Sequence, residues 1–463
     1  MSNTENNYGS IDSRSYFANK HLLQELADIF AKNNKQLYLV GGAVRDMFLN
    51  KKSADWDLTT DAKPEEVCTM FSHVIPTGIK HGTVTVRYKG HSIEVTTFRS
   101  ESDYTDGRHP GKVEYAASIE EDLSRRDFTM NSIALNLQNA KIVDPFNGRA
   151  DIKNRLIRAV GNAEERFKED GLRPMRALRF ASQLSFSLDE SLLNAIPRTL
   201  NVTAKVSMER IHDEFEKIIS SKNPIIALEH MQNTGLLKLI LPQLASCAGV
   251  MQKGYHKYDV LIHSLLALDY AAKKEYPQTV RLASLFHDIG KPKAAKLGAD
   301  DIWTFYNHEK YSCEITNTIM INLKYPNAVR EEVLHLIKEH MFNYEDCWSD
   351  AAVRRFIARC GEAYLDKLFM LRLCDSFALA GVFPPLDLLM PFQNRIEDVL
   401  QKGRTFSLKH LAVNGSDLIN IGITNGKRIG IVLHCLLEAV IDDPALNEKS
   451  RLLEIAHNME TIS

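Results

Sequence analysis

The stretch LYLVGGAVRDMFLNKKSADWDLTT, residues 37–60, decides the fold of this 463-residue chain. LYLV is a short apolar run that predicts a strand, and the two glycines after it predict a turn. AVRDMFLN (43–50) then predicts a helix, and DWDLTT (55–60) predicts a second strand. This order of strand, glycine turn, helix and strand indicates a mixed α/β domain.

The pattern changes after about residue 155. GTVTVRY (82–88) and HSIEVTTF (91–98) predict further strands, whereas DGLRPMRALRFASQLSF (170–186) and MERIHDEFEKIIS (208–220) show the apolar spacing of helices. We therefore predict an α+β protein, in which an N-terminal sheet is followed by an all-α body. The predicted boundaries are a tail at 1–22, a sheet domain at 23–155, a helical region at 156–248, a second helical domain at 249–400 and a helical tail at 401–463.

The composition narrows the class of protein. Hydrophobic residues make up 44% and charged residues 25%, which is typical of a globular chain, and no apolar run reaches the length of a membrane helix. Lys and Arg number 57 against 59 Asp and Glu, which excludes a broadly basic nucleic-acid protein but not an enzyme that meets one RNA end through a local groove. The polar N-terminus and the seven scattered cysteines predict a cytoplasmic protein with free thiols.

Asp55 and Asp57 flank one residue of a predicted strand, so their carboxylates should share one face. Carboxylate oxygens without histidine or cysteine favour hard cations, above all Mg²⁺. Glu94, in a neighbouring predicted strand, is a candidate third carboxylate. This set predicts a catalytic metal site of the kind that assists phosphoryl transfer.

Gly41 and Gly42 stand between the first strand and its helix. Without Cβ atoms, this backbone can approach a triphosphate near the helix N-terminus, and Arg45 in the first turn is a candidate phosphate ligand. A glycine turn or a D-x-D pair alone is usually structural, but the two in succession are far more specific.

Five segments in this order resemble the motifs of the superfamily of tRNA nucleotidyltransferases and bacterial poly(A) polymerases. They are GGAVRD (41–46), DWDLTT (55–60), RRDFTMNSIA (125–134), EDGLRPMRALRF (169–180) and ERIHDEFEKII (209–219). The resemblance implies a nucleotidyltransferase head (palm) at 23–155 and a nucleotide-selecting, tRNA-binding neck and body at 156–248. It also implies transfer of CMP and AMP from CTP and ATP to the 3′ end of tRNA, with Mg²⁺ at the aspartate pair.

The resemblance also assigns the nucleotide-binding residues. Arg126 and Asp127 are expected to contact the triphosphate and ribose, with support from Asn131. Arg176 and Arg179 would extend a basic face toward the phosphates.

The resemblance gives Asp170 and Arg173 the selection of the base. We expect both on one helix, three residues apart and therefore adjacent. Aspartate only accepts hydrogen bonds and arginine only donates them, so the pair matches the amino group and ring nitrogen that cytosine and adenine share. Uracil and guanine present the opposite pattern and would be rejected.

Two segments help to choose within the superfamily. TGIKHGTVTV (77–86) resembles the CCA-adding version rather than the poly(A) polymerase version. The polar segment 100–123 is expected to form the mobile loop that addition of A requires. Three alternatives stay open, namely an enzyme that adds only A, a poly(A) polymerase, and a phosphohydrolase whose head merely positions RNA.

A second group of candidate ligands lies in the helical part. The order of His263, His287-Asp288 and Asp375 resembles the HD family of metal-dependent phosphohydrolases. His308 and His340 occupy the places of ligands for a possible second metal. Mixed imidazole and carboxylate ligands suit Ni, Mn, Co or Fe as well as Mg²⁺. The resemblance implies hydrolysis of phosphate esters, and the alternative is a helical scaffold.

Overall fold

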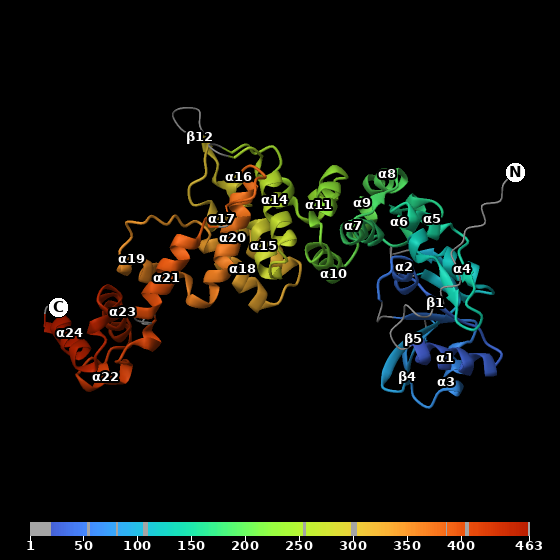
Figure 1. The fold of residues 1–463 in the computed structure, drawn as a ribbon, viewed down its shortest axis with the longest axis horizontal. Helices are drawn as coiled ribbons and strands as arrows, with labels where there is room; N and C mark the ends of the chain where they lie inside the picture. Colours follow the sequence, from blue (N-terminus) through green and yellow to red (C-terminus); the bar gives the residue numbers. More distant parts are fainter. Residues whose placement is uncertain are drawn as a thin grey trace. The chain divides into compact units, whose positions relative to one another are not determined.

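The computed structural model describes residues 20–52, 56–79, 82–104, 110–252, 256–297, 303–385, 387–402 and 407–461. The chain forms two compact units, Met1–Ala245 and Ser246–Ser463. Among the described residues, the first unit contains the sheet and the helices that follow it, and the second unit is helical apart from one small hairpin (Figure 1). The predicted α+β class, with a sheet domain followed by a helical body, is therefore confirmed.

A seven-stranded mixed sheet forms the base of the first unit. Its strands, in sheet order, are β3 (Val74–Gly78), β4 (Thr83–Tyr88), β5 (His91–Thr97), β2 (Asp57–Thr60), β1 (Leu37–Val40), β8 (Ala134–Asn136) and β9 (Ile142–Val143). Strand β2 pairs antiparallel with β1 and parallel with β5. The aligned β-branched residues of 37–60 and 82–98 therefore form the centre of the sheet, as the sequence predicts.

Short helices surround this sheet. They are α1 (Lys20–Lys32), α2 (Gly42–Phe48), α3 (Pro64–Met70), α4 (Ile119–Ser124) and α5 (Gly148–Lys153). Helices α1 and α3 pack against β1 and β4, next to the face that carries the buried residues Val84, Val86, Ile93 and Val95 (Figure 1). One face of the sheet is therefore core, which leaves the other face for function.

The described part of segment 100–123, which the sequence predicts to be a mobile loop, contains two strands and a helix. Its described part pairs β6 (Arg99–Tyr104) with β7 (Pro110–Tyr115) in an antiparallel ribbon, and α4 follows. Residues 105–109, which follow β6 in the sequence, lie outside the described residues.

Eight helices of the described chain complete the first unit, together with one two-stranded pair, β10 (Leu156–Ile157) and β11 (Ser187–Leu188). The helices are α6 (Ala163–Glu169), α7 (Arg173–Leu184), α8 (Glu190–Arg198), α9 (Leu200–Thr203), α10 (Met208–Ile219), α11 (Pro224–Asn233), α12 (Leu236–Ile240) and α13 (Pro242–Ala245). Helix α7 packs against both α10 and α11.

The structure corrects one prediction about this region. We expected Asp170 and Arg173 on one helix, but Asp170 ends α6 in an extended conformation and α7 begins at Arg173. Gly171 lies between them at a close approach, because a Cβ there would come within 2.6 Å of the Val202 carbonyl oxygen. Pro174 at the start of α7 further favours a new helix at this point.

Helices build the second unit around the histidine-rich motif. They are α14 (Val260–Lys273), α15 (Gln278–Phe286), α16 (Lys291–Ala294), α17 (His308–Asn322), α18 (Asn327–Glu339), α19 (Asp350–Cys360), α20 (Leu365–Ala378), α21 (Met390–Lys402), α22 (Gly415–Asn420), α23 (Gly426–Asp442) and α24 (Lys449–Thr461). The hairpin joins β12 (Lys296–Leu297) to β13 (Trp303–Thr304). Helices α14, α15 and α20 pack against one another.

The C-terminal segment has a hydrophobic core of its own. Leu418, Val432, Leu436 and Leu452 are buried together there, on helices α22, α23 and α24. Among the described helices of the chain, none is both long enough and apolar enough to cross a membrane.

Gly290 allows a close contact that shapes the second unit. A Cβ at this position would lie 2.4 Å from both the His308 carbonyl oxygen and the Ser312 nitrogen, and the Gly290 N–H donates to Ser312 Oγ at 2.9 Å. We expect Gly290→Ala to lower the free energy of unfolding of the second unit by about 2 kcal/mol or more, since backbone must shift. Chemical denaturation followed by circular dichroism measures this change.

Gly430→Ala is the matched control. This glycine lies inside α23, and no atom outside its own helical turn lies within 4 Å of the place a Cβ would take, so alanine should be neutral or stabilise by about 0.5–1 kcal/mol. Equal stability of the Gly290→Ala variant and the unchanged protein would contradict the close contact.

Candidate functional site

Two carboxylates meet on the open face of the sheet. Asp57 and Glu94 are directly paired in the parallel register of β2 and β5, and both are exposed. Paired residues of neighbouring strands project to the same face, so the two side chains are adjacent. Asp55 lies outside the described residues. Two carboxylates of this kind fit a hard divalent cation such as the sequence predicts.

The glycine turn lies directly beside Asp57. Gly41 adopts φ 72°, and a Cβ there would approach Asp57 Oδ2 to 3.2 Å and Arg126 Nη1 to 3.4 Å. A side chain at Gly41 would therefore fill the space between this carboxylate and this guanidinium.

Arg45 and Gly42 occupy the first turn of α2, as predicted. Arg45 is already engaged, because it donates to Asp46 Oδ1 at 2.8 Å and to Asn131 Oδ1 at 2.9 Å. Its guanidinium also lies 5.2 Å from the ring centroid of Phe180. The structure thus places Arg45 among protein partners, and its role as a phosphate ligand stays a prediction.

Asp127 is the buried centre of the predicted ribose motif. Its Oδ2 accepts from Arg176 at 2.6 and 2.9 Å, and its Oδ1 accepts from the Phe128 N–H at 2.8 Å and from Asn131 at 3.2 Å. Burial raises the pKa of Asp127, but the charges of Arg176 and Arg173 outweigh it and bring the pKa down to about 2. One hydrogen-bonded network therefore joins four of the predicted residues, Arg45, Asn131, Asp127 and Arg176.

Arg126 and Arg179 are paired with acids that the sequence analysis did not name. Arg126 donates to Asp122 at 3.1 Å, and Arg179 Nε lies 2.6 Å from Glu214 Oε2. Burial lowers the pKa of Arg179 despite the opposing effect of Glu214. The guanidinium of Arg179 also lies 4.0 Å from the ring centroid of Phe180.

The predicted base-selecting pair has separate partners. Asp170 Oδ2 accepts from Arg210 at 2.8 Å, whereas Arg173 donates to Glu169 at 2.5 Å and to the Arg125 carbonyl at 3.0 Å. Arg210 and Glu214 are four residues apart on α10 and so share one face of that helix. This spacing, visible in ERIHDEFEKII, could have identified both as partners of the selecting segment.

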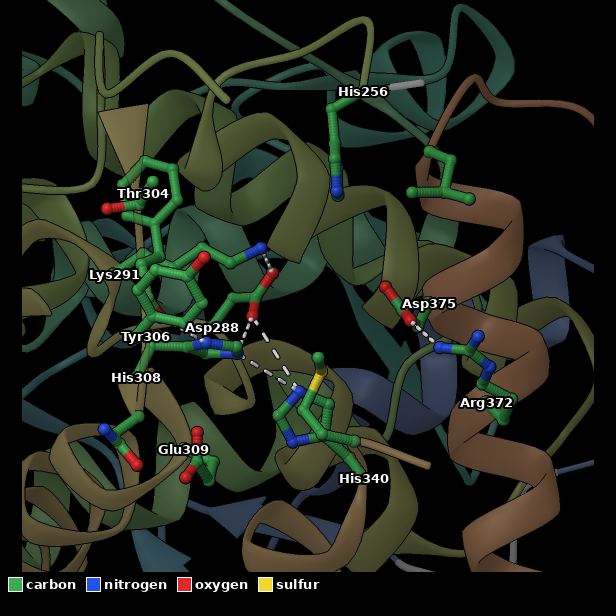
Figure 2. A pocket seen from close by; sticks show the side chains of 14 residues that line it. His256, Asp288, Lys291, Thr304, Tyr306, His308, Glu309, His340, Arg372 and Asp375 are labelled. Atoms are coloured by element: carbon green, nitrogen blue, oxygen red, sulfur yellow. Dashed lines mark hydrogen bonds and ion pairs between the residues drawn. The ribbon is translucent and has the colours of Figure 1, made fainter. Parts of the chain in front are cut away.

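The second unit brings all six predicted HD residues together, and Figure 2 shows four of them, Asp288, His308, His340 and Asp375. Asp288 lies at the centre, and its two oxygens face different groups of ligands. Oδ2 lies 3.3 Å from Nε2 of both His263 and His287, while Oδ1 lies 3.0 Å from His308 Nε2 and 3.9 Å from His340 Nε2. Asp375 Oδ1 lies 3.2 Å from His263 Nε2 and closes the first group.

The histidines are oriented as metal ligands. Nδ1 of His287, His308 and His340 lies 2.7–3.0 Å from a backbone carbonyl, which only accepts, so each Nδ1 carries a hydrogen and each Nε2 is left to bind. Burial lowers the pKa of His340 to about 3, and neighbouring His287 adds to this effect. Burial also disfavours charge on His287, but Asp288 outweighs it and raises the pKa to about 10, so without a cation His287 Nε2 also carries a proton, which a bound cation would replace. This donor set fits a divalent cation.

A cavity of about 490 Å³ opens next to this cluster (Figure 2). Lys291 lines it and donates to Asp288 Oδ2 at 2.6 Å, and Arg372 lines it and donates to Asp375 Oδ2 at 3.0 Å. Tyr306 and Met341 form exposed parts of the lining. The cavity therefore joins a ligand cluster to cationic groups, which suits an anionic substrate.

Asp127 allows a pH-dependent test of the network in the first unit. Its folded pKa of about 2 lies below the ordinary value of 3.8, so its ionised form stabilises the fold above pH 3.8 and this contribution is lost as the pH falls toward 2. We expect Asp127→Asn to cost about 2 kcal/mol at pH 7 and about half as much at pH 3. Urea unfolding at both pH values measures this, and a pH-independent difference would contradict it.

Comparison with known proteins separates three segments of the chain. Residues 37–158 match the poly A polymerase head domain, residues 185–247 match the probable RNA and SrmB-binding site of polymerase A, and residues 258–375 match the HD domain. The first match contains the carboxylate pair and Asp127, and the third contains all six HD residues.

Some curated relatives match a little less than half of the chain, and others match nearly all of it. The CCA-adding enzyme of Lactobacillus delbrueckii subsp. bulgaricus is 51% identical over 43% of this chain, and the match spans only half of that protein. The CCA-adding enzyme of Ligilactobacillus salivarius is 34% identical over 92% of this chain and 93% of its own length.

Solved structures agree with this result. The Bacillus stearothermophilus CCA-adding enzyme in complex with CTP is similar at a TM-score of 0.69 and 29% identity, over 95% of this chain and 98% of that one. The Thermotoga maritima CCA-adding enzyme complexed with tRNA shares the fold, at a TM-score of 0.59 and 19% identity over 95% of each chain. With a relative similar over nearly its whole length and with the nucleotidyltransferase head in place, this chain belongs to the family of CCA-adding enzymes.

Proposed function

We propose that this chain adds C and A to the 3′ end of tRNA, with CTP and ATP as substrates and without a nucleic-acid template. The observation that carries the proposal is the pairing of Asp57 with Glu94 beside Gly41 and Arg126. In the reaction, the RNA 3′-oxygen bonds to the α-phosphorus, the bond to the pyrophosphate oxygen breaks, and the hydroxyl proton passes to solvent.

We assign different parts of this reaction to different residues of the head. Asp55, Asp57 and Glu94 are proposed to hold Mg²⁺, which when bound stabilises the charge on the reacting phosphate. Arg126 lies on the β1 side of Asp57, where it can receive the triphosphate, and Arg176 holds Asp127 in place for the ribose. The Gly41 backbone leaves room for the phosphates between them.

Asp170 and Arg173 are proposed to select the base. Asp170 lies on the turn before α7, and Arg173 is the first residue of α7. Arg210 orients Asp170 through its 2.8 Å contact. Because Asp170 is held by one oxygen to Arg210 and by the other to the Leu172 N–H at 3.0 Å, its acceptor face is set before a nucleotide enters. Such preorganisation favours an amino group over a carbonyl oxygen.

The transferase proposal is tested with tRNA that lacks CCA and each nucleoside triphosphate in turn. We expect the unchanged protein to add C, and then A, to give one CCA end when the products are sequenced. Asp57→Asn should lower the rate of both additions by about 10³-fold or more, since charge stabilisation at the reacting phosphate is lost. A long A tail on generic RNA, addition of A alone, or C addition retained by the variant would contradict the assignment.

Asp28→Asn is the control for this variant. Asp28 lies on α1 and contacts only Gln24 among the contacts seen for its side chain in the described chain. The control removes the same charge from the same unit and should leave both additions unchanged.

We propose a second activity, hydrolysis of phosphate esters at the HD cluster. The supporting observation is that Asp288 presents each of its oxygens to a different group of histidines, which suits two divalent ions. A transition metal such as Ni, Mn, Co or Fe, or Mg²⁺, would supply an activated water there when bound. Lys291 and Arg372 are placed to neutralise the phosphate in the adjacent cavity.

The metal content tests this second proposal independently of activity. We expect elemental analysis of the purified protein to find two ions per chain, and fewer ions in a variant that carries both His308→Ala and His340→Ala. We expect His287→Ala to lose hydrolysis of 2′,3′-cyclic AMP. His434→Ala, an exposed position on α23, is the control. Unchanged metal content in the double variant, or unchanged hydrolysis in His287→Ala, would contradict the site.

Two predictions from the sequence are not tested by the structure and stay predictions. They are a cytoplasmic location and the division of the chain into residues 1–22, 23–155, 156–248, 249–400 and 401–463.

A further inference from the structure

The open face of the sheet continues past the carboxylate pair toward the edge strands. Thr85 on β4 is the direct partner of Glu94 on β5, and Arg87 is the partner of Ser92, two residues further along the same strands. Because side chains alternate along a strand, Arg87 and Ser92 share the face of Glu94 and Asp57. Strands about 4.8 Å apart place Arg87 two strands, or about 10 Å across the sheet, from Asp57.

A hollow of about 770 Å³ lies at this end of the sheet. It is formed by His73 before β3, by Arg87, Lys89 and His91 around the β4–β5 turn, and by their small neighbours. None of the described residues that line it is acidic. The hollow is therefore a concave cationic surface next to a carboxylate site.

Arg87 is the cation of this hollow that is available to a ligand. Lys89 is paired with Glu25 at 2.6 Å, and the His91 ring lies over Trp56 with centroids 6.5 Å apart. Arg87 is exposed, and among the described residues no side-chain partner of its guanidinium is found. An exposed guanidinium in a hollow without acidic residues is suited to a phosphate group.

The geometry of phosphoryl transfer indicates which phosphate this is. The attacking and leaving oxygens lie roughly in line on opposite sides of the transferred phosphorus. Gly41 and Arg126 lie on the β1 side of Asp57, where the triphosphate and its pyrophosphate leaving group are proposed to bind. The attacking 3′-hydroxyl must then approach from the β5 and β4 side, which is the side of Arg87.

We propose that this hollow binds the backbone of the single-stranded 3′ end of the acceptor RNA, with Arg87 contacting a phosphate close to the terminal nucleotide. The proposal rests on the transferase function above and adds the path of the acceptor strand. His73 and His91 border the same path and contribute polar ring edges. Arg87 is thus a positioning residue for the RNA, whereas Arg126 and Arg176 serve the nucleotide.

The test compares Arg87→Ala with the unchanged protein on tRNA that lacks CCA. Fluorescence anisotropy gives the dissociation constant over a range of salt concentrations, and initial rates give separate KM values for tRNA and CTP. We expect the dissociation constant and the KM for tRNA to rise about tenfold, as for loss of one charged hydrogen bond. The slope of log affinity against log salt should fall by about 0.7 in magnitude, as for one single-strand phosphate contact. The KM for CTP should stay unchanged, and Arg87→Lys should restore most of the affinity.

Lys141→Ala is the charge-matched control. Lys141 is exposed between β8 and β9, at the opposite edge of the same sheet, so its loss should leave tRNA affinity unchanged. Equal weakening by Arg87→Ala and Lys141→Ala, unchanged tRNA affinity in Arg87→Ala, or a rise in the KM for CTP instead would overturn the proposal.

The two proposals fail in different ways. If the unchanged protein adds no C but Arg87→Ala still weakens tRNA binding, the transferase function is wrong and the RNA site stands. If C addition occurs and Arg87→Ala binds and uses tRNA normally, the RNA site is wrong and the transferase function stands.

Discussion

The position of strand β2 between β1 and β5 is the constraint on which the head depends. Its antiparallel pairing with β1 sets Asp57 opposite Val40, one residue before the glycine turn, and its parallel pairing with β5 sets Asp57 opposite Glu94. A shift of one residue would turn Asp57 to the buried face, because side chains alternate along a strand. The register therefore places the two carboxylates beside the glycine turn on the open face of the sheet.

The buried charge of Asp127 plays the corresponding role between the sheet domain and the helices after it. Arg176 on α7 reaches back to Asp127, and Arg173 at the start of α7 donates to the Arg125 carbonyl. A buried carboxylate costs free energy unless it is paired, so the fold requires the arginine partners of Asp127 to stay in place. They hold the start of α7 against the segment that contains Arg125 and Asp127.

Asp288 lies in the turn after α15 and organises the second unit in a similar way, with neighbours that come from several helices. Its Oδ1 meets the start of α17 and the end of α18, while its Oδ2 faces α14. Gly290 makes this possible by letting the backbone of α17 approach closely. Within one chain, two anionic centres are thus built by different means, one from strand register and one from helix ends.

The amino-acid sequence was sufficient to predict the strand–turn–helix–strand start, the α+β class, the family and every member of the HD cluster, because these rest on local periodicity and on residue types in a fixed order. It was wrong about the helix through Asp170, where a local 3.6-residue pattern concealed the turn that Gly171 and the contact with Val202 require. The folded chain alone reveals the partners of Asp122, Arg210 and Glu214, the engagement of Arg45 by Asn131, and the alignment of Arg87 with the carboxylate row. Most of these contacts join residues far apart in the chain, and strand pairing and helix packing set them, so no short stretch of sequence encodes them.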